Sequence, residues 1–201
     1  MGNTRAQAIL SEWFGDLDSG GMSSTATQKR WWTKDPAFDD HLRALFEADV
    51  QAAMLGEMDS WLEEPSTTLA LILLLDQITR NIYRDLPEMY FGDARALKAV
   101  DKLLSTGGDL QLPVQQRVFA YMPLMHAESN HRQQQSVAQF KKLLDEASDL
   151  TRQTLSNYYS FAQKHAEIIA RFGRFPHRNA VLERTSTGDE VAFLQEPGSS
   201  F

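Results

Sequence analysis

The chain has no cysteine among its 201 residues. This absence excludes disulfide bonds, a thiol nucleophile, cysteine-held iron–sulfur clusters and cysteine zinc sites. Long hydrophobic runs are also missing, because the longest covers only residues 69–75, whereas a helix that crosses a bilayer needs roughly 20 apolar residues. The first ten residues lack the long apolar core of a signal peptide. We therefore expect a cytoplasmic protein without a membrane partner.

Positive charge is scarce as well. The chain has 20 lysines and arginines against 27 aspartates and glutamates, which gives a formal net charge of −7. Non-specific binding to nucleic acid depends on summed Lys and Arg charge, so we expect no nucleic-acid partner. A focused anion-binding site remains compatible with this balance.

Helix signals occur along most of the chain. Asp35 before Pro36 marks a helix start, because Asp accepts from free backbone N–H groups and Pro loses nothing at the first helical position. Gly56 offers the left-handed residue that ends helices. The expected helices cover residues 9–14, 36–55, 69–82, 93–107, 113–125, 130–147 and 151–172, with a short last helix after 187.

Two further helix starts are expected from capping residues. Ser66 or Thr67 is expected to cap the apolar helix over 69–82, and Asp93 the helix that follows. Thr187 and Glu190 fit a capping box.

Strand signals are weak by comparison, since no Asn-Gly or Asp-Gly hairpin joins alternating segments. We therefore predict an all-α fold of antiparallel helical hairpins, either a bundle or an α-solenoid-like stack. No linker divides the chain, so we expect one domain over residues 1–201, with a frayed tail after about residue 196.

The first polar segment follows directly on the apolar run. Burial of that run carries Asp76 inward, and Arg80 lies four residues further on, on the same helix face. Gln77 with Asn81, and Arg80 with Arg84, repeat the spacing. One interpretation is an ion pair that completes a core helix, because a desolvated carboxylate needs a partner. The other is part of a binding site.

The second polar segment surrounds a proline inside a helix. Pro123 removes one backbone hydrogen bond and is expected to kink the helix beside His126 and Glu128. The spacing of His126, Glu128 and His131 does not give the paired i,i+4 ligands of a helical zinc site, so we expect no metal. Tyr121 suits either core packing or a ligand contact.

The third polar segment joins a helix to an arginine-rich loop. His165 follows the 3.6-residue apolar period of its helix and is expected to face inward, either as a hydrogen-bonded core residue or as an acid–base group. No Asp or Glu occurs from residue 168 to 182. The loop contributes five polar residues, namely Arg171, Arg174, His177, Arg178 and Asn179.

Arginines outnumber the acids near them in sequence. Arg80, Arg84 and the three arginines of the loop face only Asp76 and Glu128 as obvious local acids. This surplus favours anion binding. The alternative is a structural role, in which the loop arginines bind the carbonyl groups at helix C-termini.

These segments carry a resemblance to a known family. The matching sequence segments are Glu12-Trp13-Phe14-Gly15, Trp31-Trp32, Lys34 to Asp39, Leu75-Asp76-Gln77 with Arg80-Asn81, Tyr121 to His126 with Glu128, and Arg171 to Asn179. The chain resembles the bacterial family called domain of unknown function 924. The resemblance implies an all-helical, tetratricopeptide-like fold and no established activity. Ile78-Thr79 departs from the family's usual Phe-Pro and is expected to remove a kink, and Glu183 stands at a usual Gly.

Two functions follow as hypotheses. One is a pocket for a small phosphate- or carboxylate-bearing ligand, without a cofactor, whose acid–base candidates are His126, Glu128 and His165. The candidate ligand-binding residues are Asp76, Gln77, Arg80, Asn81, Arg84, Tyr121, Arg171, Arg174, His177, Arg178 and Asn179. The alternative is a tetratricopeptide-like module that binds a protein or peptide, with a structural polar network.

Overall fold

The computed structural model describes residues 2–199. Its α-helices are α1 (Gly2–Phe14), α2 (Thr25–Trp31), α3 (Pro36–Leu55), α4 (Pro65–Ile72), α5 (Thr79–Ile82), α6 (Asp93–Thr106), α7 (Val114–His126), α8 (Asn130–Asp145), α9 (Arg152–Phe172) and α10 (Gly188–Phe193). Shorter turns are the 3₁₀ helices η1 (Asp59–Glu63), η3 (Pro87–Tyr90), η4 (Gly108–Gln111) and η5 (Pro176–Arg178) and the π-helix η2 (Leu73–Ile78).

The fold is all-helical, as predicted. Within residues 2–199 the extended pairing is limited to one isolated antiparallel bridge between Leu17 and Ser23. In the same part of the chain no helix is both long and apolar enough to cross a membrane. The serine at position 199 is buried and its hydroxyl donates to the Leu194 carbonyl. The frayed tail after about residue 196 stays a prediction.

Most helix boundaries match their sequence signals. The Asp35 carboxylate accepts from the N–H of Ala37, and Gly56 ends α3 with φ +85°. The capping box of Thr187 and Glu190 is also present.

Two boundaries were wrong or missed. Helix α4 begins at Pro65 without a side-chain cap, so neither Ser66 nor Thr67 caps it, and the Thr67 hydroxyl donates instead to the Trp61 carbonyl. Helix α2 was not expected; its cap is Ser24.

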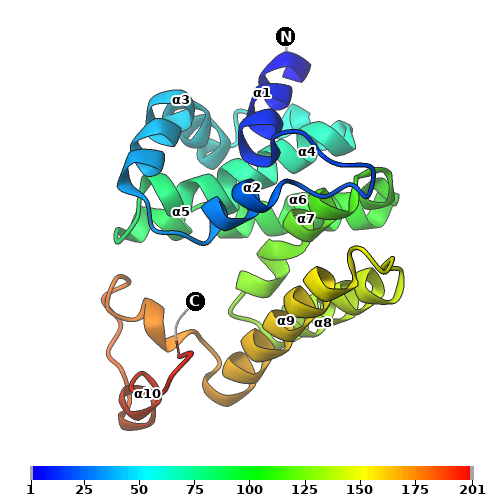
Figure 1. Ribbon diagram of the computed structural model, residues 1–201. Helices are drawn as coiled ribbons and strands as arrows, with labels where there is room; N and C mark the ends of the chain where they lie inside the picture. The colour runs from blue at the N-terminus through cyan, green and yellow to red at the C-terminus, as the bar shows by residue number, and fades with distance from the viewer. Residues whose placement is uncertain (1, 200–201) are drawn as a thin grey trace.

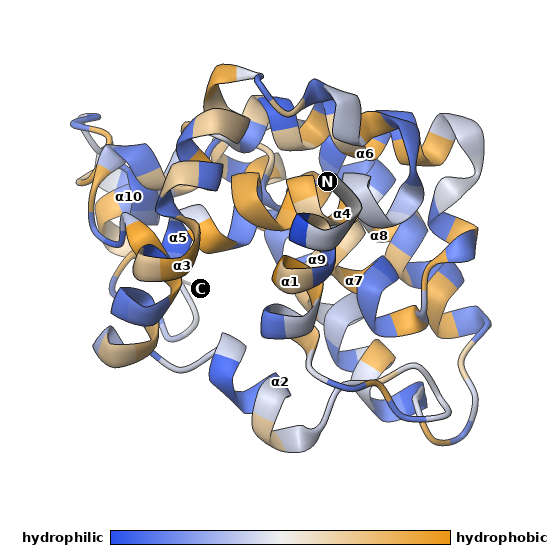
Figure 2. Cartoon of the chain, turned by 90° about the horizontal axis from the view of Figure 1, so that it is seen from above, coloured by the Kyte–Doolittle hydropathy of each residue, from blue (hydrophilic) through white to orange (hydrophobic). Residues whose placement is uncertain are grey.

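Helices α4, η2 and α5 form one continuous central helix. It contacts α1, α3, α6 and α7, while α8 and α9 form a hairpin that joins the rest through α7 (Figure 1). The other helices in Figure 2 carry both hydrophobic and hydrophilic residues, as expected for helices that bury one face. The run over residues 69–75 is buried throughout.

The hydrophobic core is divided unequally. The large core spans α1 to α9, whereas a small second cluster consists of Ile168, Ile169, Phe175 and Phe193. We call residues 173–199 the C-terminal segment. In Figure 1 it runs, in orange to red, from the end of α9. Gly173, with φ +71°, ends α9 and starts this segment.

The central helix contains a π-helical section at its most polar point. The section η2 is fully buried and includes Asp76 and Gln77. Short π-helical sections inside α-helices occur frequently at functional sites. The expected regular helix over 69–82 is therefore interrupted where its buried carboxylate lies.

Gly92 allows helix α6 to approach this section closely. Its φ of −80° is available to any residue, but a Cβ atom there would lie 2.2 Å from the Leu75 carbonyl oxygen. The missing side chain therefore sets the approach of the two helices. It also places Asp93, the next residue, beside Asp76.

We predict that Gly92→Ala lowers the free energy of unfolding by about 2 to 3 kcal/mol, because a backbone contact cannot relax like a side-chain contact. This corresponds to a Tm lower by roughly 5 to 10 °C for a chain of this size. The matched control is Gly188→Ala, where a Cβ atom meets nothing within 4 Å and stability should stay equal or rise slightly. Equal Tm values for the two variants would contradict the steric argument.

Candidate functional site

The site is organised around a fully buried carboxylate. The Asp76 side chain is 0% exposed and accepts hydrogen bonds from His126 Nδ1 at 2.8 Å and Gln77 Nε2 at 2.5 Å. Arg80 Nη1 lies 3.3 Å from its Oδ1 atom. Burial alone would raise the pKa of Asp76, but Arg80, His126 and the hydrogen bonds outweigh it and hold the pKa well below its usual range.

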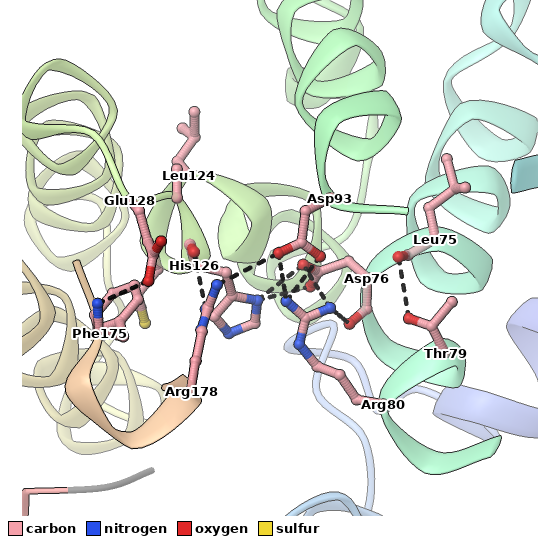
Figure 3. A network of polar contacts seen from close by, with 12 residues as sticks. Leu75, Asp76, Thr79, Arg80, Asp93, Leu124, His126, Glu128, Phe175 and Arg178 are labelled. Atoms are coloured by element: carbon pink, nitrogen blue, oxygen red, sulfur yellow. Dashed lines mark hydrogen bonds and ion pairs between the residues drawn. The ribbon is translucent and has the colours of Figure 1, made fainter. Parts of the chain in front are cut away.

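His126 is oriented by this carboxylate. It is the last residue of α7, three positions after the internal Pro123, and its side chain is 18% exposed. When the ring is neutral, Nδ1–H donates to Asp76 and leaves the Nε2 lone pair as the acceptor. Figure 3 shows the second ring nitrogen on the side away from the carboxylate. This is the arrangement of a histidine that can accept a proton.

Arg80 joins Asp76 to a second carboxylate. Its Nη2 atom binds both oxygens of Asp93, at 2.9 and 3.1 Å, and its Nη1 atom donates to the Asp76 backbone carbonyl. Burial raises the pKa of Asp93, and repulsion from Asp76 adds to this effect, against the attraction of Arg80 and Arg178. The prediction that Asp93 caps α6 is wrong: Gly92 holds the cap position and the Asp93 carboxylate binds arginine instead.

Arg178 brings the C-terminal segment into the same cluster. Its side chain is 8% exposed, Nη2 donates to the His126 carbonyl at 2.9 Å, and Nη1 lies 3.5 Å from Asp93 Oδ2. The guanidinium lies over the rings of Tyr90 and Phe175, with its carbon atom 4.7 and 4.5 Å from their centroids. Its Nε atom is buried and finds no hydrogen-bond partner among residues 2–199. Burial and the charge of Arg80 lower its pKa.

We call Asp76, Gln77, Arg80, Asp93, His126 and Arg178 the central cluster. It draws on η2, α5, α6, α7 and η5, as Figure 3 shows for most of its members. Arg178 is its least compensated charge, because it shares Asp93 with Arg80 and leaves one donor unused.

Two further histidines lie beside the cluster. The His165 ring centroid is 6.2 Å from that of His126, and His165 Nδ1 is 2.8 Å from the Phe161 carbonyl, to which it can donate. Burial, followed by the effect of His126, lowers the pKa of His165 to about 3. Burial and Arg178 lower the pKa of His177 to about 4. Both rings are therefore neutral near pH 7, and His165 faces inward as predicted.

A separate network anchors the C-terminal segment, and we call it the anchor network. Glu128 binds Arg184 through two contacts of 2.6 and 2.9 Å and accepts from the Phe175 N–H at 2.8 Å. Burial would raise the pKa of Glu128, but these donors lower it overall. Asn179 links Arg184 to Glu190, which binds Arg174.

The structure therefore does not gather all the predicted residues into one site. Asp76, Gln77, Arg80, His126 and Arg178 share the central cluster, with His165 and His177 beside it. The others lie elsewhere. Asn81 and Arg84 bind Asp39 on α3, and the Tyr121 hydroxyl donates to Asp109. The anchor network contains Glu128, Arg174 and Asn179, and Arg171 lies over the rings of Phe172 and Phe193.

The arginine surplus inferred from local sequence is smaller than expected. Arg84 and Arg174 each have a bidentate carboxylate partner, Asp39 and Glu190, from a different part of the chain. The open cleft beside Arg171 and Arg174, of about 440 Å³, is lined also by Asp189 and is separate from the central cluster.

Sequence reasoning missed five residues that shape these networks, namely Asp39, Tyr90, Asp93, Arg184 and Glu190. Asp93 and Glu190 carried only helix-start signals, which say nothing of a distant arginine. Arg184 directly follows Glu183 in the sequence, but its partner is the distant Glu128. Glu183 itself takes φ +53°, a left-handed conformation that glycine adopts more easily than other residues.

We predict a pH dependence of stability from His165. The unfolded chain binds a proton there below about pH 6.5, whereas the folded chain resists it until about pH 3, so stability is complete above pH 6.5 and falls on acidification. His165→Asn should make the slope shallower by up to about 1.4 kcal/mol per pH unit in urea denaturation between pH 7 and 5. His131→Asn, at an exposed position, should keep the wild-type slope. An unchanged slope in His165→Asn would refute the assignment.

Comparison with known proteins places this chain in a family. The model of a family described as a bacterial protein of unknown function, DUF924, matches residues 9–198. A solved structure of a protein of unknown function from Agrobacterium tumefaciens is 34% identical, covers 97% of this chain and 99% of that chain, and superposes with a TM-score of 0.80. No curated protein matches the chain. The family match over nearly the whole sequence, together with this shared fold, shows that the chain belongs to the DUF924 family.

Proposed function

We propose that the central cluster binds a small molecule bearing a carboxylate or phosphate group, and that His126 exchanges a proton with this molecule. Arg178 holds the anionic group, and Asp76 keeps His126 in the tautomer that accepts a proton at Nε2. The observation that carries the proposal is the hydrogen bond between His126 and the fully buried Asp76, next to an arginine with an unused donor.

The chemistry of the pair supports a role in proton transfer. A buried carboxylate bound to histidine Nδ1 orients the ring and stabilises the imidazolium that forms when Nε2 accepts a proton. The low pKa of Asp76 keeps it ionised, so the proton stays on the histidine. A core ion pair alone would be completed by Arg80 and would not need an oriented, partly exposed imidazole.

The partial exposure of the cluster supports ligand access. The side chains of Asp93, His126 and Arg80 are 23%, 18% and 17% exposed, whereas Asp76 is fully buried. Charged hydrogen bonds are stronger in such a low-dielectric environment than in water. The alternative function, a protein-binding module, remains a prediction that rests on the helical hairpins.

Binding is testable by thermal shift with sodium acetate and sodium phosphate at ionic strength matched with chloride. A ligand at ten times its Kd adds about 1.4 kcal/mol to stability, which raises Tm by roughly 3 to 6 °C. Arg178→Gln should abolish the rise. Arg174→Gln is the matched control, because the same change in the same loop removes an arginine that binds Glu190 instead.

The control separates a specific site from general salt effects. The rise should persist in Arg174→Gln and vanish in Arg178→Gln. Equal shifts in the wild type and both variants, or no shift with either anion, would refute the proposed function.

A further inference from the structure

The charges of the central cluster balance when His126 is neutral and nothing is bound. With His126 neutral, the carboxylates of Asp76 and Asp93 offset the guanidinium groups of Arg80 and Arg178. The neighbouring Glu128 and Arg184 offset each other. A bound anion therefore adds uncompensated negative charge to a buried region, which is costly unless a proton accompanies it.

His126 is the group placed to take up that proton. The titratable and charged groups that face it come from every element around it: Asp76 from η2, Arg80 from α5, Asp93 from α6, His165 from α9, and His177 and Arg178 from η5. One proton on Nε2 restores neutrality after a single negative charge enters.

A second proton has no acceptor nearby. The low pKa values of His165, about 3, and His177, about 4, keep both rings neutral at pH 7 because each is buried beside other positive groups. Tyr90 cannot take up this proton either, because burial raises its pKa and the neutral phenol has no site for a further proton. A dianion would leave one negative charge unbalanced.

Other arginines of the chain show which anion suits the unused donor. Arg84 holds the Asp39 carboxylate through Nε and Nη2, at 2.7 and 2.9 Å, and Arg174 holds Glu190 through the same two atoms, at 2.6 and 2.7 Å. In Arg178 this Nε atom is buried without a partner. The edge that binds carboxylate elsewhere is incomplete here.

From the charge balance and this open edge we infer that the group bound at Arg178 is a monoanionic carboxylate, that His126 takes up one proton as it binds, and that phosphate dianions are excluded. The half-buried Tyr90 ring covers one face of Arg178 and leaves its Nε edge for the ligand. This inference rests on the proposed function and chooses between the two anion classes that the proposal allows.

The test compares acetate with methyl phosphate, which is mostly dianionic at pH 7.5. Titration calorimetry of the full-length chain should give acetate a Kd at least about tenfold lower, since one unbalanced buried charge costs at least the equivalent of one pKa unit. Repeating the acetate titration in two buffers with different ionisation enthalpies should show uptake of about one proton per acetate.

Three variants assign the effects. Arg178→Gln should lose acetate binding, and Arg174→Gln should keep both the affinity and the proton uptake. His126→Asn can still donate to Asp76 but cannot accept a proton, so it should bind acetate more weakly and without proton uptake. Circular dichroism confirms that each variant is folded.

The outcomes separate this inference from the proposed function. Methyl phosphate binding as tightly as acetate, in an Arg178-dependent way, would leave the anion site standing and overturn the carboxylate assignment. Acetate binding without proton uptake in the wild type would also overturn it. Binding of neither anion would refute the proposed function itself.

Discussion

The structure depends on one buried negative charge. Asp76 lies entirely away from water, where an isolated carboxylate would be protonated or would destabilise the fold by several kcal/mol. It stays ionised because Arg80, His126 and Gln77 surround it from three positions on two chain segments. The positions of these three side chains are therefore constrained far more tightly than packing alone would demand. The same holds for the helices that carry them.

Each surrounding element meets the constraint through a local irregularity. The central helix changes to a π-helix where Asp76 occurs, and the cap residue of α6 is a glycine at which a Cβ atom would clash with the Leu75 carbonyl. Helix α7 contains a proline three residues before His126. Such departures from regular geometry cost stability, and they persist only where the surrounding structure holds the backbone in place. These irregularities converge on one carboxylate.

The sequence predicts those features that depend on neighbours along the chain. The inward position of Asp76 follows from the seven apolar residues before it, and that of His165 follows from the period of its helix. The same reasoning fails for Arg84 and Arg174, because their partners lie 45 and 16 residues away. Charge pairing is a property of the tertiary structure, so a local count of acids overestimates free arginines. The π-helix has no comparable local signal, since its side chains are those of any buried helix.

The C-terminal segment determines whether the region that it covers carries an excess of positive or of negative charge. It supplies Arg178 to the central cluster and Arg184 to Glu128, whereas the acids Asp76, Asp93 and Glu128 all precede it in the chain. Without residues 173–199, Arg80 is the one arginine of the central cluster and the anchor network that remains. The three carboxylates would then outnumber it, and the region would attract cations. Release of the chain from residue 173 onward, for example by proteolysis, would thus invert the kind of ligand the region attracts.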